Sequence, residues 1–180
     1  MDKKMRIAVL VCVLVILVST FVSARSGVAK LVRTASDAFV EGTDGSGYSI
    51  YSDLQKRVAL SRNLRTVALR YLDSSDPLIA KLSSAADLLE GERSPAKAYE
   101  ANQALSDAVS AVDKKLSGLE LTATDENYRI GIMTDLASYS STIAHDGYNE
   151  LVRSVKDELS RFPADLFAKI GFVGGVEYFK

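Results

Sequence analysis

An uncharged, strongly apolar stretch near the N-terminus constrains this chain more than any other feature. No charged residue falls between Arg6 and Arg25, which leaves 18 uncharged residues from Ile7 to Ala24. As an α-helix rising about 1.5 Å per residue, they would span roughly 27 Å, close to the ~30 Å hydrocarbon core of a bilayer. The stretch therefore predicts a protein that is delivered to a membrane or across it.

Two interpretations of this stretch stay open. Basic residues precede it and the small residues of Val22-Ser23-Ala24 end it, as in a cleaved signal peptide. Its uncharged length, however, exceeds the ~7–15-residue apolar region of such peptides, and Arg25 follows at once. We therefore favour retention of residues 1–24 as a signal-anchor, with a juxtamembrane helix and a glycine-rich linker over residues 25–47.

The charges that flank the stretch favour one orientation by a narrow margin. Three basic residues and the amino terminus precede it, and three basic residues follow it closely. Because basic residues are retained on the cytoplasmic side, we expect a single-pass protein of the cell membrane with the N-terminus inside and the following domain extracytoplasmic. The residues concerned are Lys3, Lys4 and Arg6 before the stretch, and Arg25, Lys30 and Arg33 after it.

Composition excludes several classes of function. The net charge of −1 gives no reason to expect a nucleic-acid partner. The single cysteine, Cys12, lies inside the apolar stretch, so the rest of the chain has neither disulfide nor thiolate chemistry. The only histidine is His145, and one histidine cannot by itself supply an ordinary zinc site. A catalytic triad would have to use His145, but the sequence contains no nucleophile elbow. We therefore expect no enzyme activity, no metal and no cofactor.

Residues 48–180 read as a helical bundle domain, because apolar residues recur at three- and four-residue steps and no strand alternation of useful length appears. Capping residues followed by proline, Asp76-Pro77 and Ser94-Pro95, predict the starts of two helices, and Thr124 or Asp125 the start of the last long one. The expected helices cover residues 48–72, 78–89, 95–116, 124–162 and, in a short C-terminal piece, 164–170.

The expected fold is all-α, with an N-terminal transmembrane helix followed by an elongated antiparallel four-helix bundle and a short C-terminal helix. The 39 residues from Thr124 to Phe162 are expected to form one helix, and Gly147 is the most favourable place for a bend. The helix over 48–72 is basic, and we expect its charges to form a solvated face that pairs with acidic neighbours; the alternative is that they bind an anionic surface. The basic residues are Lys56, Arg57, Arg62, Arg65 and Arg70, and the acidic ones are Asp87, Glu90 and Glu92.

Two sets of residues are candidates for a functional role. The first is an interhelical polar network, in which buried asparagines would fix the register of the bundle or line a polar ligand pocket. Its members are Asn63, Asn102, His145, Tyr148 and Asn149. The second is a C-terminal clasp, because aromatic residues close to a chain end are expected to dock on the bundle or to bind a partner. Its members are Phe162, Pro163, Gly171, Phe172, Tyr178 and Phe179.

The chain resembles the LemA family over nearly its whole length. The C-terminal part carries the resemblance with Tyr148-Asn149, Val152, Phe162-Pro163, Leu166, Ala168, Gly171-Phe172 and Tyr178-Phe179. Earlier parts add Leu31-Val32, Ala38-Phe39, Asn63-Leu64, Ala101-Asn102, Leu105 and Ala108. The resemblance implies one N-terminal membrane helix that carries an elongated four-helix bundle. The glycine-rich linker at 42–47 departs from the family pattern.

Two functions from different classes follow. In the first, the protein is an interaction or scaffold module of the cell envelope, a membrane-tethered helical bundle whose surface binds an unidentified protein partner. In the second, it is a secreted or anchored binding protein, or an atypical enzyme, with a polar interhelical pocket near Asn149 and His145. The absence of ionisable residues from the apolar stripes favours the first, and the sequence leaves a homo-oligomer open.

Overall fold

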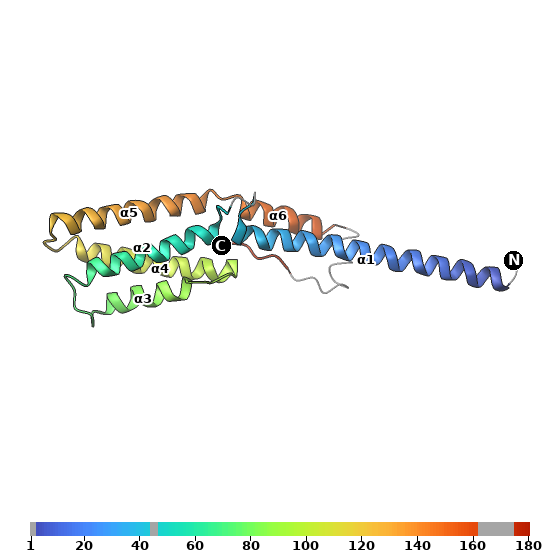
Figure 1. Cartoon of the computed structure of the whole chain (residues 1–180), viewed down its shortest axis with the longest axis horizontal. Helices are drawn as coiled ribbons and strands as arrows, with labels where there is room; N and C mark the ends of the chain where they lie inside the picture. The colour runs from blue at the N-terminus through green and yellow to red at the C-terminus, as the bar shows by residue number, and fades with distance from the viewer. Residues whose placement is uncertain (1–2, 44–46, 162–174) are drawn as a thin grey trace. The chain divides into compact units, whose positions relative to one another are not determined.

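The computed structural model describes residues 3–43, 47–161 and 175–180, and within them the chain is helical without any strand (Figure 1). This confirms the all-α class. The described helices are α1 (Lys3–Glu41), α2 (Ile50–Ala68), α3 (Pro77–Leu89), α4 (Pro95–Leu116), α5 (Ala123–Ala144) and α6 (Tyr148–Leu159).

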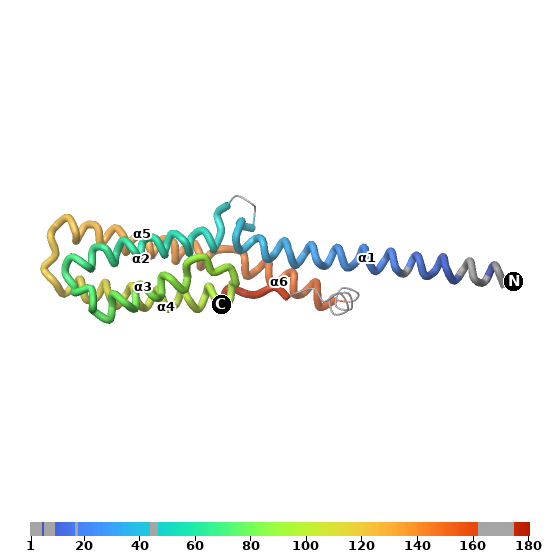
Figure 2. Tube along the Cα trace, turned by 60° about the horizontal axis from the view of Figure 1, so that its bottom comes forward, coloured from blue at the N-terminus to red at the C-terminus, as the bar shows by residue number. Residues whose placement is uncertain are grey.

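The chain divides into two compact units. Unit 1 comprises Met1–Ser36 and Glu150–Val176, and unit 2 comprises Asp37–Asn149 and Glu177–Lys180. Within unit 1, the α6 helix runs beside α1 in both views (Figures 1 and 2). Each of these two helices has a buried apolar face, with Val28 and Ala35 on α1 and Val152 and Val155 on α6.

The α1 helix continues without interruption through the apolar stretch and the juxtamembrane residues. It ends where Gly42 adopts a left-handed backbone angle of φ 89°, which glycine tolerates better than any residue with a Cβ atom. Ser49 then caps α2 by accepting a hydrogen bond from the Ser52 N–H at 3.1 Å. The same hydroxyl donates to the Val40 carbonyl at 2.9 Å, which ties the end of α1 to the start of α2.

The two caps followed by proline lie where the sequence predicts them. Asp76 accepts from the Leu78 N–H at 2.9 Å and Pro77 is the first residue of α3. Ser94 and Pro95 begin α4 in the same way. These starts are local signals, since a side-chain oxygen satisfies a free N–H of the first turn and proline has no N–H to lose.

Two expectations about the last long helix are wrong. Its cap is Thr122, which accepts from the Asp125 N–H at 3.2 Å, and not Thr124 or Asp125. The helix is not continuous to Phe162, because α5 ends at Ala144 and a separate helix, α6, begins at Tyr148. Asp146 accepts from the Tyr148 N–H at 2.7 Å, so a side chain satisfies the free donor that a new helix start creates. The chain therefore breaks around Gly147 where only a bend was expected.

Helix packing in unit 2 centres on α2, which contacts α3, α4 and α5, while α3 also packs against α4 (Figure 2). The contacts bury the apolar stripes that periodicity predicts. The fully buried leucines of this core include Leu54, Leu64, Leu82, Leu89, Leu105 and Leu116. The expected helix over 164–170 and the clasp residues Phe162, Pro163, Gly171 and Phe172 lie outside the described residues.

Candidate interaction site

The last residues of the chain fit into an aromatic cluster within unit 2. Phe179 is only 6% exposed. Its ring meets the edge of the Tyr99 ring on α4, with centroids 5.3 Å apart at 89°, and lies 6.0 Å from the ring of Phe39 at the end of α1. Phe39 in turn lies 5.5 Å from Tyr148 at the start of α6. Such distances and tilts are the favourable ones for aromatic pairs.

Asn149 holds the main chain of the same residue from both sides. The Phe179 N–H donates to Oδ1 of Asn149 at 3.0 Å, and Nδ2 of Asn149 donates to the Phe179 carbonyl at 2.9 Å. One carboxamide thereby provides the donor and the acceptor that a neighbouring β-strand would provide. The contact fixes the direction of the terminal residues as well as the position of the ring.

Two further hydrogen bonds bind Glu177. The Tyr148 hydroxyl donates to the Glu177 carbonyl at 2.8 Å, and the Ser94 hydroxyl donates to the Glu177 carboxylate at 2.7 Å. Tyr148 is completely buried, and this burial, reinforced by the negative charge of Glu177, raises the pKa of its phenol to about 12. Below, "the tail" means Glu177–Lys180 and "the tail seat" means the five residues that receive it. These are Phe39, Ser94, Tyr99, Tyr148 and Asn149.

A second polar site, centred on Arg57, lies between α2, α4 and α5. The residue is only 3% exposed, and burial lowers the pKa of its guanidinium. It donates to the Leu136 carbonyl at 3.0 Å, to the Ser106 hydroxyl at 2.8 Å and to the Ser140 hydroxyl. Its Nε and the Oδ1 of Asn102 are buried without hydrogen-bond partners among the described residues. The expectation that Arg57 belongs to a solvated face is therefore wrong.

A carboxylate joins α2 to α5 at the far end of α2. Asp125, on the first turn of α5, accepts from the Tyr71 hydroxyl at 2.6 Å, from the Thr122 hydroxyl at 3.1 Å and from Arg70. Hydrogen bonding from Tyr71, aided by Thr122 and by the charge of Arg70, lowers the pKa of this buried carboxyl. We call these four residues the Asp125 cluster. Sequence reasoning placed Asp125 only as a candidate cap.

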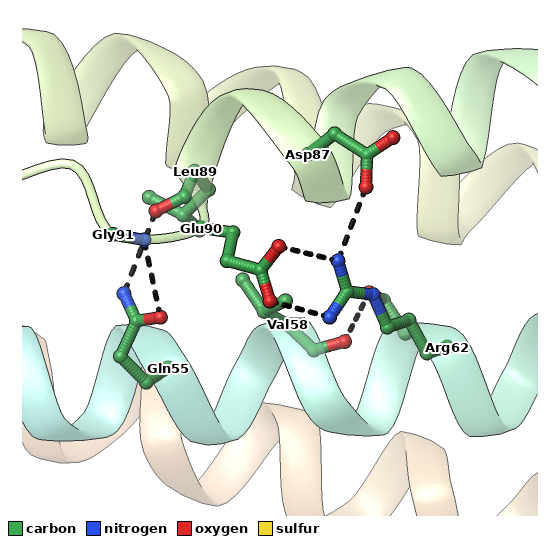
Figure 3. Close-up of polar contacts among 8 residues, drawn as sticks. Gln55, Val58, Arg62, Asp87, Leu89, Glu90 and Gly91 are labelled. Carbon is green, nitrogen blue, oxygen red and sulfur yellow. Dashed lines mark hydrogen bonds and ion pairs between the residues drawn. The ribbon is translucent and has the colours of Figure 1, made fainter.

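The outer surface of α2 binds the end of α3, as Figure 3 shows. Arg62 donates to both Glu90 oxygens, at 2.6 and 2.8 Å, and to Asp87 at 3.1 Å. This confirms the predicted pairing for these residues, and the bonds raise the pKa of Arg62 and lower that of Glu90. Gln55 donates to the Leu89 carbonyl at 3.5 Å and accepts from the Gly91 N–H at 3.3 Å, so it closes the C-terminal end of α3.

The structure does not bring the five residues of the predicted polar network together. Asn63 is exposed, and Asn102 is half-buried on α4. His145 is exposed at the end of α5, with Nδ1 2.8 Å from the Ser141 carbonyl oxygen. Only Tyr148 and Asn149 share a site, and that site is the tail seat.

Within the described residues, no group of three or more His, Cys, Asp or Glu residues could hold a metal ion. An open depression of about 530 Å³ is lined, as far as the described residues go, by Ser19, Thr20, Ser23 and Ala24. All four of these lining residues lie on α1.

Sequence reasoning missed Phe39 and Tyr99, which supply two walls of the tail seat. Both fall on apolar stripes, where an aromatic residue is indistinguishable from ordinary core. The cluster of aromatic residues at the C-terminus is the signal that was available, since such residues need other side chains to pack against elsewhere in the fold.

Among the described residues, α1 is the one helix whose length and composition would let it cross a membrane, over Leu10–Glu41, where an 18-residue window has a mean hydropathy of 2.0. Fold and site together define a helical protein with such a helix and with a docked C-terminal tail. Comparisons with family models, with curated proteins and with solved structures give no match.

Proposed function

We propose that this chain is a single-pass membrane protein whose helical unit acts as an interaction or scaffold module of the cell envelope. The observation that carries the proposal is the exposure of α1. The consecutive residues Val13, Leu14, Val15 and Ile16 are all exposed, with Leu14 at 61%. Because successive helical residues point about 100° apart, no face of this segment is covered by the described protein. A lipid environment satisfies an apolar helix of this kind on every side.

Retention of the segment fits the continuity of α1. The small residues Val22-Ser23-Ala24 lie inside a helix that runs on to Glu41. Cleavage after Ala24 would cut this helix, whereas retention as an anchor keeps it whole. The basic residues Lys3, Lys4 and Arg6 favour a cytoplasmic N-terminus and an extracytoplasmic unit 2.

In this proposal α2 to α5 form an antiparallel four-helix bundle of the LemA type. The contacts of α2 with α3, α4 and α5 support the arrangement, as do the short connections between successive helices. The LemA assignment rests on the residue pattern, in which Tyr148-Asn149 and Tyr178-Phe179 are prominent. These residues include the two that bind the tail main chain and the phenylalanine that fills the aromatic cluster. A structural role of these residues in binding the tail would account for their presence in the LemA-like pattern.

Fractionation of cells that produce the full chain tests the tether. We expect the protein in the membrane fraction after high-salt and alkaline carbonate washes, and release only by detergent. A matched variant with Leu14→Lys and Ile16→Lys should shift toward the soluble fraction, because each charge at a helix centre costs about 2.5–3.5 kcal/mol on insertion.

Sequencing the mature N-terminus separates the two interpretations of the stretch. A mature protein that begins at Arg25 would overturn the anchor. Protease added to cells without outer layers should digest unit 2, and complete protection until lysis would reverse the proposed topology.

A further inference from the structure

The helices α4 and α5 have the same length but differ in how much apolar surface they bury. Each has 22 residues, and α4 buries six apolar side chains whereas α5 buries three, Ile132, Leu136 and Ile143. The main packing partner of α5 is α2, and α5 lies on the side of α2 away from α3 in both views (Figures 1 and 2). In contrast, α2, α3 and α4 all pack against one another. Burial of apolar area therefore stabilises the docking of α5 less than that of α4.

Polar contacts join α5 to its neighbours at several places along its length. When a helix leaves, such bonds are replaced by bonds to water, so the net contribution of each is much smaller than its strength. Separation of α2, α3 and α4 would instead expose their buried leucines to water. Below, "the α5 seam" means the polar contacts of α5. They join Asp125 to Arg70 and Tyr71, Arg129 to Asp113 on α4, and Arg57 on α2 to Ser140 and the Leu136 carbonyl.

Arg57 is the member of the α5 seam that opposes docking. Its side chain is almost completely buried, and its hydrogen-bond partners are two hydroxyls and a carbonyl. Among the described residues, no carboxylate forms an ion pair with it. An arginine keeps its charge in proteins, and burial of a charge among neutral partners costs more free energy than the hydrogen bonds return. Hydration of Arg57 therefore favours a state in which α5 has moved away.

Removal of the guanidinium would leave neither hydroxyl of the α5 site without a partner. Ser106 donates to the Asn102 carbonyl at 2.9 Å, and Ser140 donates to the Leu136 carbonyl at 2.9 Å. Both bonds lie within one helix and do not involve Arg57. Replacement of a buried charged group by an apolar side chain of similar volume is often stabilising. Arg57 thus weakens the docked state, and its neighbours do not need it to satisfy their hydrogen bonds.

We infer that α5 is a detachable helix, which breaks the α5 seam and leaves α2 and α4 while α2, α3 and α4 remain packed together. Arg57 sets how often α5 detaches, because its burial lowers the free-energy difference between the docked and the detached state. In the detached state, Arg57 and Ser106 are exposed to solvent. The opening lies within unit 2, so it goes beyond the proposed function and does not depend on the membrane tether.

Hydrogen exchange of the full chain in detergent, followed by mass spectrometry, tests the opening. Helical stability comes mostly from tertiary packing, and Gly131 lowers the helix propensity of α5 further, so the amides of a detached α5 exchange. We expect the central amides of α5 to be at least about tenfold less protected than those of α3 and α4, which open only with the whole of unit 2. This arm needs no substitution in the protein.

Two variants on α2 test the role of Arg57. Arg57→Met removes the buried charge, and we expect the protection of α5 to rise about tenfold or more, as the replacement of buried charges by apolar side chains implies. Arg62→Met is the matched control, because it removes an exposed arginine from the same helix. The protection of α5 in this control should stay within about twofold of the parent.

Two results would overturn the inference. One is equal protection of α5, α3 and α4 in the parent, because unit 2 would then open as a whole. The other is an Arg57→Met chain whose α5 is no better protected than in the parent, or which fails to fold, because the guanidinium would then hold α5 in place. Fractionation of the same cells reports separately on the tether, so failure of the opening and failure of the proposed function are distinguishable.

Discussion

Two sites lie near the two ends of α2, and each holds together residues that are far apart in the sequence. The two sites differ in the kind of interaction that stabilises them. Near the start of α2, the tail seat binds a phenylalanine ring and neutral main-chain groups, with Asn149 and Phe179 separated by 30 residues. Beyond its end, the Asp125 cluster places one ionised carboxylate among hydroxyl and guanidinium donors, with Tyr71 and Asp125 separated by 54 residues. Burial of apolar area dominates the first site and charge-assisted hydrogen bonding the second.

This difference predicts that the two sites respond differently to salt and to pH. A phenylalanine in an aromatic site responds little to salt or to acid, whereas a carboxylate held in its charged form loses its interactions once it is protonated. A substitution or a pH change should therefore weaken one site and leave the other in place. The following four predictions use this contrast, and all refer to the full chain in detergent.

The largest effect is expected from Phe179→Ala. Truncation of a buried phenylalanine leaves a cavity and removes two ring contacts, so we expect the free energy of unfolding to fall by about 3 kcal/mol. Denaturant titration followed by circular dichroism measures the change. Lys180→Ala, one residue further along, should stay within about 0.5 kcal/mol of the parent. A similar small loss for Phe179→Ala would show that the tail does not stabilise the fold.

Asp125→Asn should have the next largest effect, and its effect should depend on pH. The pKa of Asp125 is lowered in the folded protein, so its ionised form stabilises the fold above the unfolded value of about 3.9. That contribution is lost as the pH falls through the lower folded pKa. The parent should therefore lose more stability on acidification than Asp125→Asn does. Parallel acid-dependence curves for the two proteins would contradict the role assigned to the carboxylate.

Tyr148→Phe should destabilise by about 1 kcal/mol near neutral pH, because the hydrogen bond to the Glu177 carbonyl is lost while the ring remains. The parent protein should in addition lose stability at alkaline pH. Its phenol has a pKa raised to about 12, above the ordinary value of about 10. The unfolded state thus releases the proton first, and stability falls between about pH 10 and about 12. The difference between the two proteins should shrink over this range, and a constant difference would contradict the assignment.

The smallest effect is expected from Arg62→Ala. The guanidinium makes three bonds to Glu90 and Asp87, yet all three side chains are exposed, so screening and side-chain entropy offset most of the attraction. Thermal melts at low and high salt should barely separate the variant from its parent. A loss as large as that of Phe179→Ala would mean that this surface pair matters as much as the buried tail.

Local signals in the sequence account for much of the fold. The starts of α3 and α4 follow from Asp76-Pro77 and Ser94-Pro95, since a cap and a proline act within one turn. The pairing of Arg62 with Asp87 and Glu90 followed from the charge of α2 and the acidity of the next helix. The break before α6 was underestimated, because a glycine indicates a weak point and the cap from Asp146 decides between a bend and a new helix.

The sequence by itself determined the helical class, the caps of α3 and α4, and an apolar segment long enough to cross a membrane. Tertiary structure alone decided which polar groups are buried. Arg57 looked like its exposed neighbours on α2, and only the approach of Ser106 on α4 and Leu136 on α5 makes its site. Likewise, Phe179 finds its place through Phe39, Tyr99 and Asn149, which lie 140, 80 and 30 residues away. Periodicity and capping act over a few residues, whereas burial depends on which distant segments the fold brings together.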